Sequence, residues 1–241
     1  MAYDFNGTNQ YLDLASVPVS GVPLTMAGWY RYDTALGVGQ EMTIMSLTDA
    51  SDDQEFTIEI GENGGTDYAI AVTFSGGFNG ALSSVEPQVN TWEHIGGVFS
   101  AIDSRIVYLN GVNVGSDSGS ATPSGISNVN IGATLSSGAP AKDFNGAIAE
   151  CAIWNVALTA TEMAILADGF SPLFVRPQSL VFYAPIVRGL QNLKGGTSLT
   201  NNSGTVFSHP RIYYPTGYTI APFAAAATNT RRYSLTTLGV G

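Results

Sequence analysis

The chain has 241 residues, of which 44% are hydrophobic and only 12% charged, with 28 glycines and 11 prolines. This composition favours short strands joined by tight turns and excludes both a disordered chain and one built from long charged helices. One cysteine, Cys151, excludes an intrachain disulfide, and the net charge of −10 argues against nucleic-acid binding, because phosphate contacts need a basic surface.

The N-terminal residues 1–14 already have the pattern of a strand and lack the basic and apolar regions of a secretion signal. No run approaches the roughly 18 apolar residues of a membrane span. We therefore expect no signal peptide and no membrane partner. Alternating or β-rich runs then follow along the chain, and turn residues separate nearly all of them. The predicted strands are residues 11–14, 24–32, 41–47, 56–60, 68–74, 94–99, 105–109, 129–133 and 147–154.

Two local signals stand out in the second half of this strand-rich part. Asn110-Gly111 lies between two β-rich runs and predicts a hairpin with a type I′ turn, which needs positive φ at both central residues. Thr159 followed by Glu162 fits a capping box and predicts one short helix, which Gly169 ends as the first residue past its C-cap.

The chain changes character near residue 170. Prolines now punctuate short apolar runs, all 19 acidic residues lie before this point, and six of the nine basic residues lie after it. Such an asymmetry indicates an interaction surface or tail. We predict two parts, a sandwich domain over residues 1–170 and a Pro-rich, strand-containing basic extension over residues 171–241 that serves assembly.

Several separated motifs in the first part occur in the order typical of one family. They are the opening segment Tyr3–Leu14, the strand Leu24–Tyr30, the pair Thr91–Ile95 and Val107–Gly111, the segment Asn130–Gly132, and the closing strand with its helix, Phe144–Glu150 and Trp154–Glu162. Together they resemble the laminin-G-like, pentraxin-like (concanavalin A-like) jelly roll. The resemblance implies an all-β fold of two antiparallel sheets with one short capping helix, and a loop rim as the usual binding region.

Catalysis is not expected. Glucanases of the same architecture use paired carboxylates, and the nearest analogues are Glu55, Glu59 and Glu62. Glu55 and Glu59 share a strand face, but four residues of strand separate them by roughly 13 Å, more than a retaining or an inverting hydrolase allows. We also expect His94 and Cys151 to be buried scaffold residues. The sequence therefore predicts a non-enzymatic protein with no catalytic residue.

Calcium and glycan binding remain open alternatives. The acidic loop with Asp49, Asp52 and Asp53 could supply oxygen ligands for Ca²⁺, although many relatives carry an aspartate where this chain has Ala149. A solvated acidic loop without any cofactor is the competing interpretation. We expect the three tryptophans to pack in the core, and Tyr68 and Phe78 to be the better candidates for glycan contact.

The basic extension suggests assembly rather than catalysis. Its arginines Arg176, Arg188, Arg211, Arg231 and Arg232 are the residues predicted to contact a partner. The domain and its arginine-bearing tail also resemble accessory structural proteins of tailed bacteriophages. We therefore expect a virion structural protein, most of all a head decoration or cement protein, with a capsid or other virion protein and its own copies (for example a trimer) as partners. The alternative is an extracellular or cell-surface carbohydrate-binding module, such as a receptor-binding or tail-fibre protein.

Overall fold

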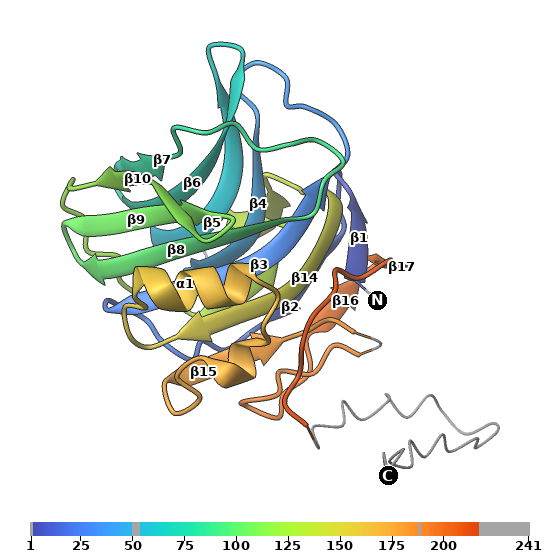
Figure 1. Ribbon diagram of the computed structural model, residues 1–241. Coiled ribbons are helices and arrows are strands. Elements are labelled where there is room, and N and C mark those ends of the chain that lie inside the picture. The colour runs from blue at the N-terminus through green and yellow to red at the C-terminus, as the bar shows by residue number, and fades with distance from the viewer. Residues whose placement is uncertain (1, 50–53, 188, 217–241) are drawn as a thin grey trace, which may run out of the picture.

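The computed structural model describes residues 2–49, 54–187 and 189–216, and these fold into a sandwich of two antiparallel sheets (Figure 1). Its elements are β1 (Ala2–Asn6), β2 (Tyr11–Leu14), β3 (Leu24–Tyr32), β4 (Glu41–Thr48), β5 (Gln54–Asn63), β6 (Thr66–Ser75), β7 (Phe78–Leu82), β8 (Glu93–Ala101), β9 (Ser104–Leu109), β10 (Val112–Asp117), β11 (Asn128–Ile131), β12 (Thr134–Ser136), β13 (Ala139–Ala141), β14 (Asn145–Trp154), α1 (Ala160–Ala167), the 3-10 turn η1 (Pro172–Phe174), β15 (Leu180–Ala184), β16 (Thr200–Asn202) and β17 (Thr205–Phe207).

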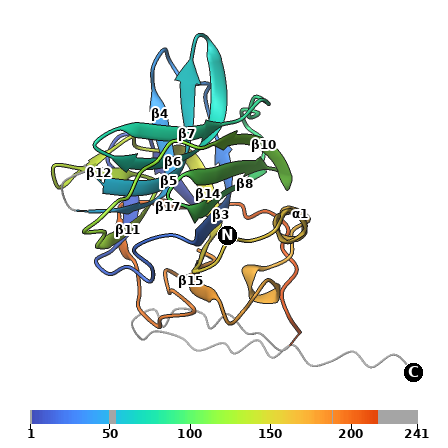
Figure 2. The same cartoon turned by 90° about the vertical axis from the view of Figure 1, so that its left-hand side faces the viewer.

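The two sheets differ in their strand order, and α1 covers the outer face of the first. The first sheet has the strand order β10-β9-β8-β3-β14-β1-β17, and β15 also pairs with β14. The second sheet has the order β16-β2-β11-β4-β5-β6-β7. Figures 1 and 2 show α1 lying across the outer face of the first sheet, away from the second. The predicted all-β, two-sheet architecture with one helix is confirmed.

Strand alternation explains how the core forms. In β3, Met26 and Tyr30 face the second sheet and join a buried cluster with Ile58 of β5. The next residue after Met26, Ala27, faces outward and packs with Met163 of α1 in a second cluster. Because side chains alternate across a strand, one sequence run supplies both layers of packing. Cys151 is fully buried in the core, as predicted.

Both local signals are confirmed. Asn110 and Gly111 have φ values of 48° and 79°, as a type I′ turn requires, and they join β9 to β10. The Thr159 side chain accepts a hydrogen bond from the backbone of Glu162, whose own side chain caps the backbone of Thr159. Gly169 has a φ of 87° directly after the helix C-cap.

The chain after residue 170 adds strands to both sheets. β15 pairs with the closing strand β14, β16 pairs with β2, and β17 pairs with β1. The predicted strand content of this extension is therefore present, and its strands belong to the same two sheets as residues 2–154. The domain boundary and the assembly role of the extension stay predictions. Within the described ranges, no helix has the length and apolar character needed to cross a membrane.

Candidate functional site

A polar pocket opens at the end of the sandwich where the β3–β4 loop lies. It encloses about 570 Å³. Three segments far apart in sequence line it: the β1–β2 turn at residues 6–7, the β3–β4 loop and first residues of β4 within 34–42, and residues 142–145 between β13 and β14. We call it the rim pocket. It is large enough for a sugar residue or a short glycan, because small-molecule sites begin at about 300 Å³.

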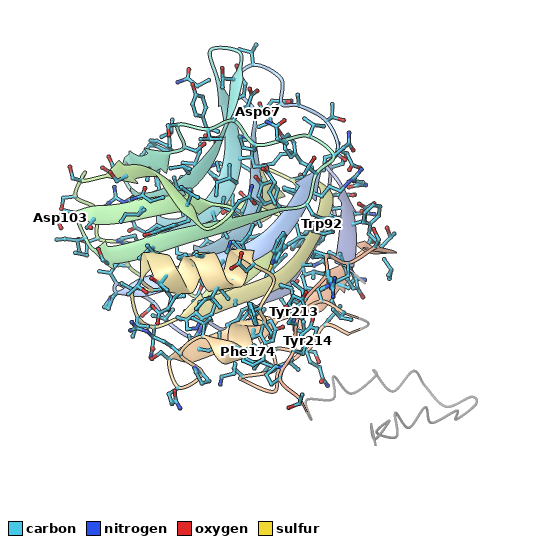
Figure 3. The ribbon with its side chains drawn as sticks, in the orientation of Figure 1. Asp67, Trp92, Asp103, Phe174, Tyr213 and Tyr214 are labelled. Atoms are coloured by element: carbon cyan, nitrogen blue, oxygen red, sulfur yellow. The ribbon has the colours of Figure 1, made fainter. Side chains whose placement is uncertain are left out.

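The β3–β4 loop is held in place by side chains from two other elements. The carboxylate of Asp67 on β6 accepts a hydrogen bond from the backbone of Leu36 at 3.3 Å. Glu62 on β5 accepts one from the backbone of Gly39 at 2.5 Å. Asp67 pairs with Glu62 beside the turn that joins β5 to β6, and Figure 3 shows it at this end of the molecule. Buried or half-buried acceptors fix an otherwise irregular loop, so this wall of the pocket is preorganised.

Lys142 lines the pocket and contacts three carboxylates, of which only that of Glu41 belongs to the pocket lining. Its Nζ lies 3.0 Å from Glu41 Oε2, 3.3 Å from Glu59 Oε2 and 3.8 Å from Glu55 Oε1. Burial alone would lower the pKa of Lys142, but the charges of the three glutamates outweigh it and raise that pKa. Burial raises the pKa of Glu59 to about 7, although the Lys142 charge acts in the opposite direction.

The predicted separation of Glu55 and Glu59 is wrong for their carboxylates. Their backbone positions are four residues apart on β5, but both side chains lean toward the same ammonium group of Lys142. Glu59 is completely buried, Glu55 is 3% exposed, and the Lys142 ammonium contacts both carboxylates. The non-catalytic character of the protein stays a prediction.

The open part of the pocket is polar and carries negative charge. Lys142 is already neutralised by its carboxylate partners, whereas Asp143 beside it has no ion-pair partner among the described residues. Burial raises the pKa of Asp143. The buried atom Asp143 Oδ1 also lacks a hydrogen-bond partner in the part of the chain that the structure describes. The lining therefore offers acceptors and amide groups rather than a cationic centre.

A second polar cluster surrounds Glu150, at a bulge of β14 where its φ is 57°. Its carboxylate accepts hydrogen bonds of 2.5 Å from both the Tyr183 and Tyr214 hydroxyls, and His209 Nε2 lies 3.0 Å away. Burial, followed by the charge of Glu150, raises the pKa of both tyrosines. The adjoining cavity encloses only about 10 Å³, so this cluster holds the extension against β14 and leaves no room for a ligand.

The predicted glycan contacts are not brought together. Phe78 lies in β7, not in a loop, and pairs with Phe74 at one end of β6, whereas Tyr68 lies near the other end, opposite Gly61. Neither lines the rim pocket. Phe78 is 51% exposed, so it is available for contact, but the two rings do not share a site. Their role in glycan binding stays a prediction.

The tryptophans divide between two environments. Trp154 is fully buried beneath α1, as predicted. Trp29 and Trp92 are only partly buried and pack over small alanines on the outer face of the first sheet, where Figure 3 shows Trp92. His94 is 2% exposed and lies edge-on to Trp29 with ring centroids 5.6 Å apart. Burial lowers the pKa of His94 to about 3, which keeps the ring neutral.

The predicted calcium residues are only partly covered by the structure. Asp49 is described at the end of β4, and Asp52 and Asp53 lie outside the described residues. Among the described residues, no three His, Cys, Asp or Glu side chains gather as a metal site. The oxygen ligands that Ca²⁺ prefers are therefore not assembled by the described part of the loop, and calcium binding stays a prediction.

The structure describes two of the five arginines that were predicted to contact a partner. Arg176 Nε lies 2.5 Å from Glu162 Oε1 of α1, so this arginine pairs within its own chain. Arg211 lies over the ring of Tyr213, with its guanidinium carbon 5.1 Å from the ring centroid. Arg188, Arg231 and Arg232 lie outside the described residues.

Sequence reasoning missed the residues of the rim pocket. They come from three segments that no periodicity connects, and each contributes between one and three polar side chains. One signal was present, because Lys142-Asp143 is the single charged pair between Asp117 and Glu150 in a stretch rich in small residues. An isolated charged pair in such a stretch marks a specific polar environment, although it does not reveal the partners.

The fold and the rim pocket define a lectin-like β-sandwich. A model of the concanavalin A-like lectin/glucanases superfamily matches residues 6–164. The chain therefore belongs to this superfamily. No curated protein sequence matches the chain significantly.

Three solved structures with the same fold are a pentraxin, a candidate carbohydrate-binding protein and a domain of an arabinanase. A native heptameric SAP-like pentraxin from Limulus polyphemus has a TM-score of 0.62 at 18% identity, over 85% of this chain and 93% of that one. A candidate carbohydrate-binding protein from Bacteroides ovatus has a TM-score of 0.61 at 18% identity, over 88% and 61%. Domain 4 of an extracellular arabinanase from Geobacillus stearothermophilus, in complex with arabinotriose, has a TM-score of 0.54 at 18% identity, over 69% and 76%. At these identities the likeness shows the fold alone.

Proposed function

We propose that this protein is a non-catalytic carbohydrate-binding module and that the rim pocket binds a neutral glycan. The observation that carries the proposal is a preorganised polar pocket of about 570 Å³ at the end of a lectin-like sandwich. Similarity to a candidate carbohydrate-binding protein and to an arabinotriose-bound domain supports it.

The chemistry of the lining supports a neutral ligand. Sugar hydroxyls can donate hydrogen bonds to the carboxylates of Glu41 and Asp143 and can exchange hydrogen bonds with the amide of Asn145. An anionic sugar would meet these carboxylates, and the Lys142 charge beside them is already shared among three glutamates, so no free cation among the described lining residues balances it. Like charges at such short range disfavour binding.

Binding of the purified protein to a panel of neutral and sialylated oligosaccharides, followed by calorimetry on the best ligand, tests this proposal. We expect saturable binding of a neutral glycan only. Asp143→Ala, which removes a pocket acceptor, should weaken that binding at least roughly tenfold, as the loss of a charge-assisted hydrogen bond implies. Asp103→Ala is the matched control, because Asp103 lies at the far end of the sheets in the β8–β9 turn (Figure 3).

Two outcomes would overturn the proposal. Equal affinity of the Asp143 and Asp103 variants would place the glycan elsewhere on the surface. A complete lack of binding to neutral glycans, or a preference for sialylated ones, would remove the proposed ligand class.

The place of action follows from this function. Similarity to an extracellular arabinanase domain supports a module that acts outside the cell or at a cell surface. Similarity to a heptameric pentraxin supports self-association of this chain as well. Multivalent display would raise the avidity of a module whose single sites bind weakly.

A virion role remains a second candidate. The acid-free, arginine-bearing segment after residue 168 favours it, because such a segment can dock on an acidic partner. A head decoration protein would cosediment with purified capsids at a fixed stoichiometry. A receptor-binding or tail-fibre protein would instead bind host surface glycans, which also satisfies the first proposal.

A further inference from the structure

Three exposed aromatic side chains from distant segments form one patch beside α1. Phe170, Phe174 and Tyr213 are 40%, 48% and 44% exposed. The Phe170 ring centroid lies 5.9 Å from that of Phe174 and 5.5 Å from that of Tyr213. Figure 3 shows Phe174 and Tyr213 in the same region of the surface near the helix, and Phe170 contacts both of them. We call these three residues the aromatic patch.

The aromatic patch is held rigidly by the backbone on both sides. The amide of Tyr213 donates to Gly169 O at 2.8 Å, and the amide of Ser171 donates to Tyr213 O at 2.9 Å. The next residue, Tyr214, is anchored on the buried Glu150 at 2.5 Å. The rings are therefore preorganised, which lowers the entropic cost of binding a partner.

An exposed arginine borders the patch. Arg211 is exposed and stacks on Tyr213, and no carboxylate of the described residues lies within ion-pair distance of it. Asp168, two residues before Phe170, forms no ion pair with Arg211, and the chain after Asp168 contains no acid. Aromatic residues and arginine are the types enriched in protein interfaces.

We infer that the aromatic patch with Arg211 binds the acidic jelly-roll surface of a second copy of this chain. Charge complementarity selects this occupant, because all 19 acidic residues lie at or before Asp168 and the patch belongs to the acid-free part. The contact is then heterologous, with different surfaces on the two copies. A patch-to-patch contact would instead bring two Arg211 side chains together with no acid from the extension to balance them.

The mass of the full-length protein, measured by light scattering over a wide range of concentration and salt, tests this inference. We expect a reversible oligomer that dissociates as sodium chloride is added. Phe174→Ser and Arg211→Glu should each weaken self-association at least roughly tenfold, which is the loss typical of an interface hot spot. Val38→Ser is the control, because Val38 is 92% exposed in the β3–β4 loop, outside the patch. Tyr213→Phe keeps the ring and should associate like the unmodified protein.

A mixing experiment distinguishes the two interface geometries. In a heterologous contact, a labelled Phe174→Ser copy still offers its acidic surface and is captured by the unmodified protein. In a patch-to-patch contact it is not captured, and this result would contradict the inferred geometry. A monomer at every concentration, or equal masses for the Phe174 and Val38 variants, would overturn the inference altogether. Circular dichroism and thermal unfolding confirm that each variant is folded. None of these measurements involves a glycan, so failure here leaves the proposed function untouched.

Discussion

The hydroxyl of Tyr214 donates a hydrogen bond of 2.5 Å to the buried carboxylate of Glu150, 64 residues earlier in the chain. This contact joins the last described segment to the closing strand of the first sheet. A polar pair of this kind, buried and charge-assisted, ties the extension to the sandwich more strongly than surface contacts would.

Removal of the Tyr214 hydroxyl should destabilise the protein. We expect Tyr214→Phe to lower the free energy of unfolding by about 1.5 to 3 kcal/mol, because it deletes one hydrogen bond to a buried charged group. Tyr213→Phe is a matched control, since the neighbouring ring is 44% exposed and its hydroxyl has no described partner. Urea denaturation of both variants checks the difference. Equal stability of the two variants would show that this hydrogen bond does not stabilise the folded protein.

Lys142 should stabilise the folded protein through its contacts with three carboxylates. Lys142→Met leaves the carboxylates of Glu41, Glu55 and Glu59 without their shared counter-charge, and we expect a loss of about 3 to 5 kcal/mol at neutral pH. The loss should shrink at acid pH, where the carboxylates take up protons. Lys194→Met is the control, because among the described residues the exposed Lys194 ammonium contacts a backbone oxygen and no carboxylate. A loss that does not change with pH would contradict this account.

Glu59 should make the protein less stable as the pH rises. Its pKa is raised from 4.5 to about 7 in the folded state, so the unfolded chain releases this proton at lower pH. The contribution to stability is complete below pH 4.5 and is lost as the pH passes 7, by about 3 kcal/mol. Glu59→Gln removes the titration, so its stability relative to the unmodified protein should rise over this range. A stability difference that stays constant between pH 4.5 and 7 would contradict this account.

His94 should make the protein less stable as the pH falls. Its pKa is lowered from 6.5 to about 3 by burial, so the unfolded chain binds a proton that the folded chain refuses. Stability is then lost as the pH falls below 6.5, by about 3 kcal/mol on reaching pH 4.5. His94→Gln should reduce this acid sensitivity when unfolding curves are compared at the two pH values. An unchanged slope would mean that His94 is protonated in the folded protein.

Local and periodic signals were sufficient for much of the fold. The type I′ turn at Asn110-Gly111 and the capping box at Thr159 each depend on a few adjacent residues, and both are confirmed. The strand runs depend on alternation, which shows which face is buried but not which strand is the neighbour. The pairing of β16 with β2 and of β17 with β1 could not be predicted, because their partners lie nearly 200 residues away.

The candidate site could not be predicted from the sequence for a related reason. The rim pocket joins side chains of three loops, and only the folded sandwich brings them together. The spacing argument for Glu55 and Glu59 also failed at the level of side chains. It measured the backbone correctly, but a glutamate can extend several ångströms along the strand toward Lys142. Backbone spacing constrains functional groups only when the side chains are short.

The pairing of the first strands with the last strands sets an order of events during synthesis. β1 and β2 leave the ribosome long before their outer neighbours β16 and β17, which begin at Thr200 and Thr205. Until then each nascent sheet ends in an unpaired edge, which is a template for wrong pairing with other chains. The pairing of β16 and β17 also depends on contacts between distant parts of the chain, and such contacts form slowly. The edges at β1 and β2 are therefore the places where misassembly would begin during synthesis.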